Sequence, residues 1–170
     1  MIHIEPKILD RINTWLTPTF DAETQQTIKD SIANNPKDIQ ESFYKDLEFG
    51  TGGMRGVMGV GTNRINKYTL GKATQGLSEF LKEEYPNETL KVVVAFDSRH
   101  QSKELAKVVA DIFTANSIHC YLFSDLRPTP ELSFAVRHLN AHCGIVLTAS
   151  HNPPEYNGYK VYGKDGGQIV

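Results

Sequence analysis

The residues best suited to chemistry lie near the end of the 170-residue sequence, in the stretch GIVLTASHNPPEYNGYKVYG (144–163). An apolar run stops at the hydroxyl of Ser150 and the imidazole of His151, and the ammonium group of Lys160 follows. A hydroxyl can act as a nucleophile or carry a phosphoryl group, whereas an imidazole and an ammonium can move protons or hold an anion. The stretch therefore raises two possibilities, a serine hydrolase and an enzyme of phosphoryl transfer.

The loop between these residues carries conformational signals of its own. Asn152 precedes a proline, which pushes its backbone toward an extended conformation, and two prolines together stiffen the loop. Asn157-Gly158 is the strongest short turn signal of the chain and predicts a reversal into a further strand. A turn of this size would bring Lys160 back beside Ser150.

A serine hydrolase fits this stretch poorly. Adjacent side chains point apart in an extended backbone, so His151 would be badly placed as the base for Ser150. The G-x-S-x-G elbow is also missing, although triads can form from distant residues. Phosphoryl chemistry fits better, because His151, Lys160 and Arg55 could surround a phosphate on Ser150. The glycines around Arg55 would let backbone N–H groups approach an anion closely.

The elements that must position these residues follow from the apolar patterns. Apolar β-branched runs predict buried strands, and apolar residues at i, i+3 and i+4 predict helices. Because strands alternate with helices, the predicted fold is α/β, a three-layer α/β/α domain with a mostly parallel, mixed sheet. The predicted strands cover residues 91–97, 119–124, 143–150 and 157–163, and the predicted helices cover 68–85, 102–117 and 129–140.

The end of two predicted strands is the expected place of the site. Asp97 and Ser150 each come directly after an apolar strand. Ligands of open α/β sheets bind beyond the carboxyl ends of the strands, so we expect both residues at that edge. Ser102 is predicted to cap the helix that follows Asp97.

The first part of the chain predicts helices and little chemistry. Residues 1–45 are expected to form a helical leader that packs on the α/β domain of residues 46–170. Ile8 and Ile12 belong to an apolar set at helical spacing, and Asp21 is predicted to be the N-cap of a second helix.

Composition narrows the class of protein. A net charge of −2 provides no broad cationic surface for nucleic acid or anionic lipid. No stretch approaches the ~18 apolar residues of a membrane span, and the N-terminus has no signal-peptide pattern. Cys120 and Cys143 lack metal-ligand spacing and are predicted to be reduced core thiols, which indicates the cytoplasm.

Four segments resemble the motifs of the α-D-phosphohexomutase superfamily, which contains the phosphoglucomutases and phosphomannomutases. TASHNPPEYNGYKVY resembles its phosphoserine loop, and EFGTGGMRGVMGVGTNRIN resembles its first glycine-arginine loop, F-G-T-x-G-x-R-G. AFDSRHQS resembles its D-x-R motif, and PTPELSFAVR resembles its P-T-P segment. The four occur in the expected order within residues 46–170, so the chain resembles the N-terminal domain of this superfamily.

The resemblance implies that Ser150 is phosphorylated and passes its phosphate to a sugar monophosphate. The resulting bisphosphate turns around and returns its other phosphate, which interconverts the 1-phosphates and 6-phosphates of glucose or mannose. Lys160 matches the lysine of proton transfer, and Arg55 matches the arginine near the phosphoserine. His151 would share the proton work. The residues implied for binding substrate or phosphate are Asn152, Arg99 and Asn157.

The resemblance also implies parts that this sequence does not contain. Mg²⁺ is the implied cofactor, with one ligand from the phosphate on Ser150 and three carboxylates from a D-G-D-x-D-R loop of a second domain. That loop has no match here, nor have the sugar-recognition and phosphate-binding loops of the third and fourth domains. The expected partners are sugar phosphates and the missing domains, and the 170-residue chain alone is expected to be inactive.

Two alternatives stay open at this point. The chain could belong to a phosphopentomutase or a sugar-bisphosphate synthase of the same superfamily. It could also be a non-catalytic phosphate-binding module. The module is the weaker alternative, because a binding pocket needs convergent polar groups on all sides and this sequence predicts only one wall.

Overall fold

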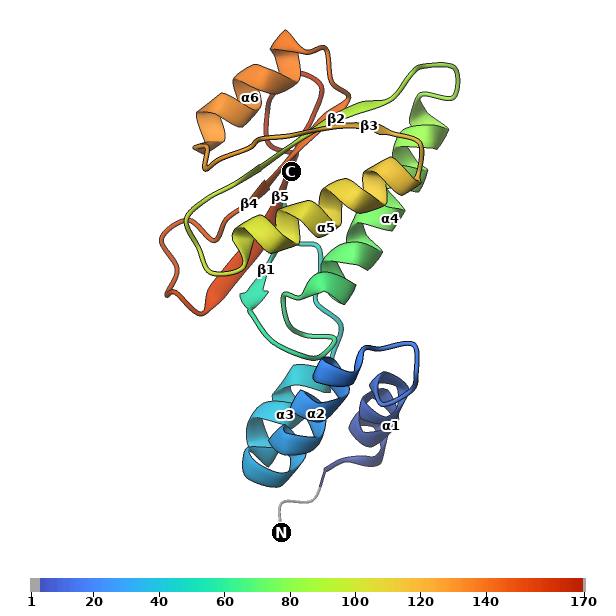
Figure 1. Cartoon of the computed structure of the whole chain (residues 1–170), viewed down its shortest axis with the longest axis vertical. Coiled ribbons are helices and arrows are strands. Elements are labelled where there is room, and N and C mark those ends of the chain that lie inside the picture. The colour runs from blue at the N-terminus through green and yellow to red at the C-terminus, as the bar shows by residue number, and fades with distance from the viewer. Residues whose placement is uncertain (1–3, 170) are drawn as a thin grey trace.

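The computed structural model describes residues 4–169 of the chain. Three short helices come first, and a sheet whose strands alternate with three further helices follows (Figure 1). The elements in chain order are α1 (Pro6–Trp15), α2 (Ala22–Asn34), α3 (Pro36–Phe43), β1 (Gly53–Val57), α4 (Lys67–Glu84), β2 (Lys91–Phe96), α5 (Ser102–Ala115), β3 (His119–Leu122), α6 (Thr129–His138), β4 (Cys143–Leu147) and β5 (Tyr156–Tyr162).

The strands form one mixed sheet in the order β1-β5-β4-β2-β3. β2 runs parallel to β3 and β4, because α5 and α6 provide the crossover connections that parallel neighbours need. β5 runs antiparallel to both β4 and β1. The predicted α/β class with a mixed sheet is therefore confirmed, and the parallel part consists of β2, β3 and β4.

Helices cover both faces of the sheet and complete the three layers (Figure 1). α4 and α5 pack on one face, in a core that includes Val92, Val94 and Ile145. α6 packs on the other face, in a core that includes Val93 and Val146. Neighbouring residues of a strand point to opposite faces, so β2 and β4 contribute to both cores. This double burial explains their unbroken apolar sequences.

The first three helices have an apolar cluster of their own, made of Ile8, Ile12, Trp15, Ile28, Ile39 and Phe43. Asp21 is the N-cap of α2 as predicted, because its Oδ1 accepts the N–H of Thr24 at 3.0 Å. The same carboxylate lies 2.8 Å from Lys67 Nζ and accepts the Tyr68 hydroxyl. The Lys67 and Tyr68 contacts tie α2 to the start of α4. They also hold the pKa of Asp21 well below its ordinary value of 3.8.

Strand β1 is the first correction to the sequence prediction. Its residues lie in the glycine-rich stretch that predicts only a loop, yet they pair antiparallel with β5. Gly53 has a φ of +136°, and a Cβ at this position would collide with the carbonyl oxygen of Tyr159. The glycine therefore allows two strands to approach closely, and β1 becomes an edge strand beside the predicted site.

The second correction concerns Asn157 and Gly158, which lie inside β5 and form no turn. The chain reverses earlier, within residues 150–155. A Cβ on Gly158 would lie 2.6 Å from Thr148 O, directly after β4, and 2.8 Å from Met54 O on β1. The Asn-Gly pair is thus explained by close packing between three strands, and the prediction of a turn was wrong.

The start of α5 differs by one residue from the prediction. Gln101 occupies the N-cap position with a φ of +59°, and Ser102 is the first helical residue. The Ser102 hydroxyl donates to Asp97 Oδ1 at 3.1 Å. Ser102 therefore belongs to the contacts at the end of β2.

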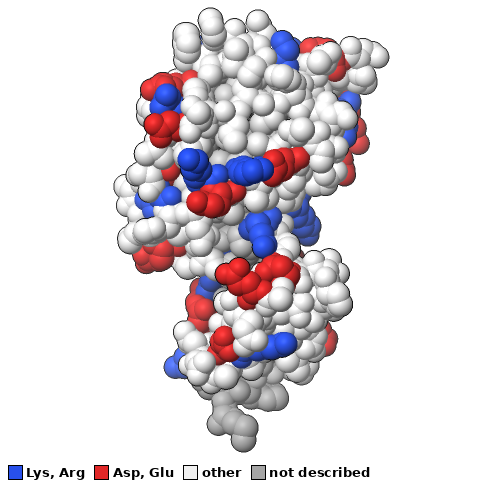
Figure 2. Space-filling view, in the orientation of Figure 1, with Lys and Arg blue, Asp and Glu red and all other residues white. Residues whose placement is uncertain are grey.

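Three expectations from composition can be compared with the structure. Basic and acidic side chains lie close to one another on the face shown in Figure 2. Between residues 4 and 169, no helix combines the length and the apolar character that crossing a bilayer requires. Both cysteines are free thiols as predicted, with Cys143 buried and Cys120 half-buried.

Candidate active site

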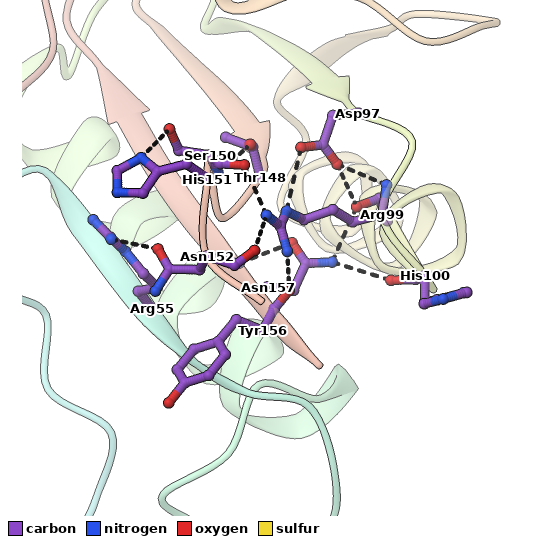
Figure 3. Close-up of polar contacts among 12 residues, drawn as sticks. Arg55, Asp97, Arg99, His100, Thr148, Ser150, His151, Asn152, Tyr156 and Asn157 are labelled. Atoms are coloured by element: carbon purple, nitrogen blue, oxygen red, sulfur yellow. Dashed lines mark hydrogen bonds and ion pairs between the residues drawn. The ribbon is translucent and has the colours of Figure 1, made fainter. Parts of the chain in front are cut away.

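Ser150 lies where the chain leaves β4, and its side chain is exposed (Figure 3). Its φ of +57° is in the left-handed region, which costs a residue with a Cβ about 1–2 kcal/mol. Two local hydrogen bonds support this conformation: Ser150 N–H donates to Thr148 Oγ1 at 3.0 Å, and Asn152 N–H donates to Ala149 O at 3.1 Å. Backbone strain of this kind clusters at functional sites.

His151 lies beside the serine, with Nδ1 3.3 Å from Ser150 Oγ (Figure 3). The expectation that the two adjacent side chains point apart was wrong, because it assumed an extended backbone and Ser150 is left-handed. Within residues 4–169, no carboxylate contacts the His151 ring. The orienting acid of a Ser-His-Asp triad is therefore missing from the described part of the chain, which leaves the hydrolase hypothesis without support.

Asn152 and Arg55 are brought together as two residues of one site. Arg55 Nη1 donates to Asn152 Oδ1 at 2.7 Å (Figure 3). Arg55 comes from β1, where it pairs in register with Gly158 of β5. The edge strand that sequence patterns missed thus delivers a cation to the loop that carries Ser150.

Arg99 holds the serine loop through its backbone. Nη2 donates to the carbonyl oxygens of Ser150 at 2.7 Å and Asn152 at 2.6 Å. Nη1 donates to the carbonyl oxygens of Pro153 at 2.9 Å and Tyr156 at 3.0 Å. These four bonds engage both terminal nitrogens of the guanidinium (Figure 3). Arg99 therefore clamps the loop that carries Ser150, and its implied binding of phosphate stays a prediction.

Asn157 is also in a different environment from the one predicted. Its exposed fraction is 0%, so the side chain cannot reach a ligand in solution. Nδ2 donates to Ser102 Oγ at 3.0 Å and to His100 O at 3.2 Å, and Oδ1 accepts the N–H of Gly158 at 2.8 Å. Asn157 therefore has a buried structural role in this structure, and its implied role in binding substrate stays a prediction.

Lys160 lies further along β5 than the predicted turn requires. It is opposite Val146 of β4, which precedes Ser150 by four residues, or about 13 Å along a strand. Across residues 4–169, Lys160 Nζ makes no hydrogen bond and no ion pair. The tight reversal that would carry the ammonium back to Ser150 does not form, since the chain already turns within residues 150–155. Proton transfer by Lys160 stays a prediction.

Two residues of the site were missed from the sequence. Thr148 supports the backbone of Ser150 through its hydroxyl, and Ser102 joins Asp97 to Asn157. A sequence signal exists for the first, because Thr148 is a polar residue two positions before Ser150, at the end of an apolar strand. Ser102 was predicted as a helix cap, and its contacts with Asp97 and Asn157 have no signal in the sequence.

A cavity of about 320 Å³ opens beside Ser150, at the carboxyl ends of β2 and β4. Its lining comes from the two loops that follow these strands, namely Asp97, Ser98, Arg99, His100, Ser150, Asn152 and Pro154. A second polar cavity of about 430 Å³ includes Arg55 and the backbone of Gly50 and Gly53. A larger hollow of about 710 Å³ near α4 is mostly apolar and contains none of the predicted site residues.

The described residues do not make a metal site by themselves. Between residues 4 and 169, no group of three or more His, Cys, Asp and Glu side chains is arranged to hold a metal ion. Asp97, the carboxylate in the lining of the cavity, already accepts Arg99 N–H and the Ser102 hydroxyl. Mg²⁺ prefers near-octahedral oxygen ligands, and a phosphate on Ser150 would supply only part of that set.

Comparison with known proteins identifies similar sequences and folds. Residues 46–170 match the family model for phosphoglucomutase/phosphomannomutase, alpha/beta/alpha domain I. A phosphoglucomutase from Staphylococcus epidermidis is 41% identical over 158 residues, which are 92% of this chain and 28% of that protein. One from Staphylococcus aureus is 46% identical over 130 residues, or 76% of this chain and 23% of that protein. The chain thus spans 23–28% of the length of these relatives.

Two solved structures share the fold. A Thermus thermophilus protein described as a phosphomannomutase has a TM-score of 0.68 and 36% identity, over 74% of this chain and 28% of that one. The open form of the Paramecium phosphoprotein parafusin has a TM-score of 0.60 and 21% identity, over 74% of this chain and 24% of that one, and supports the fold alone. The division into leader and domain stays a prediction. With the sequence match over residues 46–170, these findings show that the chain belongs to the phosphoglucomutase/phosphomannomutase family, within its first α/β/α domain.

Proposed function

We propose that this chain supplies the phosphoserine of a Mg²⁺-dependent phosphohexomutase that interconverts the 1-phosphates and 6-phosphates of glucose or mannose. The observation that carries the proposal is the exposed Ser150, held in a left-handed conformation at the carboxyl edge of the sheet. Ligands of α/β sheets bind at this edge. The relatives named phosphoglucomutase and phosphomannomutase support the choice of a hexose phosphate.

The proposed reaction consists of two phosphoryl transfers. In the first, the bond between phosphorus and Ser150 Oγ breaks while a bond forms to a hydroxyl oxygen of the sugar monophosphate. The sugar hydroxyl gives up its proton, and Ser150 Oγ takes one as it leaves. In the second, the other phosphate of the sugar bisphosphate returns to Ser150, so no phosphate is consumed.

The groups around Ser150 support these transfers. His151 Nδ1, 3.3 Å from Ser150 Oγ, is placed to exchange a proton with that oxygen. Arg55 uses only Nη1 for a hydrogen bond among residues 4–169, which leaves further N–H donors for a phosphate. Lys160 is the proposed acceptor of the proton of the sugar hydroxyl, on the strength of its match to the family lysine. This role requires the substrate to lie along β5.

Mg²⁺ would neutralise charge on the transferring phosphoryl group. A phosphorylated Ser150 provides a ligand, and the donor set of residues 4–169 does not complete the coordination shell. The remaining ligands are therefore proposed to come from the carboxylate loop that the family resemblance implies. Both cysteines are unpaired thiols, which supports the proposal that the protein works in the cytoplasm.

The test is the covalent state of the serine. The polypeptide that carries this sequence, purified from cells, is expected to hold one phosphoryl group by intact-mass analysis, and peptide mapping should place it on Ser150. Ser150→Ala should abolish the phosphate and the conversion of glucose 1-phosphate. Ser98→Ala is the matched control, because Ser98 is an exposed serine in the lining of the same cavity.

Full turnover by Ser150→Ala, together with an unphosphorylated wild type, would overturn the proposal. Substrate comparison decides between the related alternatives. Faster conversion of ribose 1-phosphate than of glucose 1-phosphate would indicate a phosphopentomutase.

A further inference from the structure

The clamp on the serine loop raises the question of what holds Arg99. Four carbonyl oxygens converge on its guanidinium, and only a group with several fixed donors can satisfy them together. Arg99 Nε lies 3.8 Å from Asp97 Oδ2, and it is the buried side-chain nitrogen without a hydrogen-bond partner among residues 4–169. The Arg99 guanidinium therefore lies closer to the four carbonyl oxygens of the loop than to the carboxylate of Asp97.

A chain of hydrogen bonds leads from β5 to the backbone of Arg99. Asn157 Nδ2 donates to Ser102 Oγ at 3.0 Å, and the Ser102 hydroxyl donates to Asp97 Oδ1 at 3.1 Å. Arg99 N–H donates to the same Asp97 oxygen at 3.0 Å. The direction of each bond is fixed, because an amide NH₂ only donates and an ionised carboxylate only accepts.

The hydrogen bonds of Ser102 and Asn157 are buried, so the loss of either partner leaves a polar group unsatisfied. Ser102 and Asn157 both have an exposed fraction of 0%, so water cannot replace a missing partner. Asn157 Nδ2 also donates to His100 O at 3.2 Å, which fixes the turn between β2 and α5 from a second side (Figure 3). The N-cap position of α5 is occupied by Gln101, and the Ser102 hydroxyl contacts Asp97 and Asn157.

The contacts close a ring around the site. The ring runs from Asn157 on β5 to Ser102 and Asp97 at the turn after β2, and from there to Arg99. Arg99 returns to the loop between β4 and β5, where Ser150 lies. The last carbonyl of the clamp belongs to Tyr156, the neighbour of Asn157, so both ends of the ring meet on β5.

We propose that Asn157 and Ser102 are positioning residues that hold Ser150 in its left-handed conformation by fixing Asp97 and Arg99. Both side chains are fully buried, so in this proposal they act through the Arg99 clamp. Their value for catalysis rests on the proposed function, since a fixed Ser150 matters for turnover only if it carries the phosphoryl group.

The test compares three variants of the whole chain by NMR. Ser102→Ala and Asn157→Ala each remove links of the ring, and Ser78→Ala is the matched control. Ser78 is also a helical serine with an exposed fraction of 0%, and its hydroxyl bonds to Thr74 O, away from the loop. The measured quantities are the solvent exchange rates of the Ser150 and Asn152 amides, and the Cα and Cβ shifts of Ser150, which report its backbone conformation.

Ser102→Ala and Asn157→Ala are expected to raise both exchange rates by about tenfold, since each removes a buried hydrogen bond. The Ser150 shifts should move away from left-handed values, while β4 amides keep their protection. If Asn157→Ala fails to fold, Ser102→Ala decides, because it removes a single oxygen atom. Wild-type loop exchange in Ser102→Ala, or an equal change in Ser78→Ala, would overturn the inference. The measurement involves no substrate, so its failure is distinct from an unphosphorylated Ser150.

Discussion

Arg55 Nη1 donates to Asn152 Oδ1 at 2.7 Å, and this bond connects positions that are 97 residues apart in the chain. Arg55 lies on the edge strand β1, whereas Asn152 lies in the loop after β4. The two segments meet because β5 pairs with β1 on one side and with β4 on the other. The cation that contacts the loop carrying Ser150 is therefore positioned by the sheet itself.

Arg55→Ala is expected to slow the phosphorylation of Ser150 by about ten- to a hundredfold, because it removes a charged hydrogen-bonding group worth about 1.5–3 kcal/mol. The free energy of unfolding should hardly change, since the bond to Asn152 is exposed. The measurement is the rate at which glucose 1,6-bisphosphate adds one phosphoryl group by intact mass. Lys45→Ala is the control, because it removes another cation from the lining of the cavity that includes Arg55. An unchanged rate for Arg55→Ala would contradict the assignment.

The central part of the fold was predictable because burial on both faces leaves a strong pattern. The apolar runs of β2 and β4 and the spaced apolar residues of α5 identified a parallel core with helices on both sides. β1 was missed because glycines in sequence indicate freedom of the backbone, whereas Gly53 and Gly158 serve close contact between strands. For the same reason the sequence predicts a turn at Asn157-Gly158, where the glycine allows close packing of strands.

The chemistry of the site was predictable only in part. Ser150, His151 and Asn152 are neighbours in one motif, whereas Arg55 reaches Asn152 through the sheet pairing of β1. The role of Arg99 depends on four backbone carbonyls, and backbone carbonyls have no signature in a sequence. The burial of a single polar side chain, such as that of Asn157, is likewise decided by packing between elements.

Gly144→Ala is expected to destabilise the protein by about 1–3 kcal/mol, the usual effect of overfilling a core. Gly144 lies in β4 beneath α6, where a Cβ would lie 2.5 Å from Val136 Cγ2 and 3.1 Å from Leu132 Cδ1. Urea unfolding measures the change. Gly76→Ala is the control in α4, because its Cβ would meet nothing within 4 Å. It should stabilise the helix by about 0.5–1 kcal/mol, and equal effects of the two variants would show that α6 does not pack on β4 as described.

Asp21 is expected to make the stability of the protein sensitive to acid. Its pKa is held below the ordinary value of 3.8 by Lys67 and Tyr68, so the ionised carboxylate stabilises the folded state above that pH. This contribution is lost as the pH falls below 3.8 toward the pKa of the folded state. Asp21→Asn should therefore lower the urea midpoint at neutral pH and do so less at about pH 3.

Asp30→Asn is the control for this pH dependence, because Asp30 is on the same helix and only accepts from Gln26 Nε2 at 2.9 Å. Its effect on the urea midpoint should be small and nearly the same at both pH values. A pH-independent difference between wild type and Asp21→Asn would mean that the contacts with Lys67 and Tyr68 do not act through ionisation.

Both cysteines are expected to resist alkylation while the protein is folded. Burial raises the pKa of Cys120 and of Cys143 from 9.0 to about 12, so the reactive thiolate is scarce at about pH 8. They flank Val92 on neighbouring strands, about 9.6 Å apart, which is beyond the reach of a disulfide. Iodoacetamide followed by mass analysis should label both residues only after unfolding in urea. Rapid labelling of the folded protein would contradict their burial.

The 170-residue chain by itself is expected to show no conversion of glucose 1-phosphate to glucose 6-phosphate. The cavity beside Ser150 is open, and its lining comes from two loops of the same sheet edge. Substrate and a metal ion need groups on several sides, whereas residues 4–169 contain no group of metal-ligating side chains. A coupled dehydrogenase assay measures turnover, with the Staphylococcus epidermidis phosphoglucomutase, 41% identical to this chain, as the positive control.

Although the isolated chain is expected to lack turnover, Ser150 is still expected to accept a phosphoryl group. If incubation with glucose 1,6-bisphosphate and Mg²⁺ places one phosphoryl group on Ser150 of the isolated chain, the residues around the loop are sufficient for the first transfer. Groups on the other sides of the substrate would then be needed for binding the sugar and for reorienting the bisphosphate between the two transfers, which one sheet edge cannot do. Turnover by the isolated chain at a rate near that of the positive control would instead show that this edge is a complete active site.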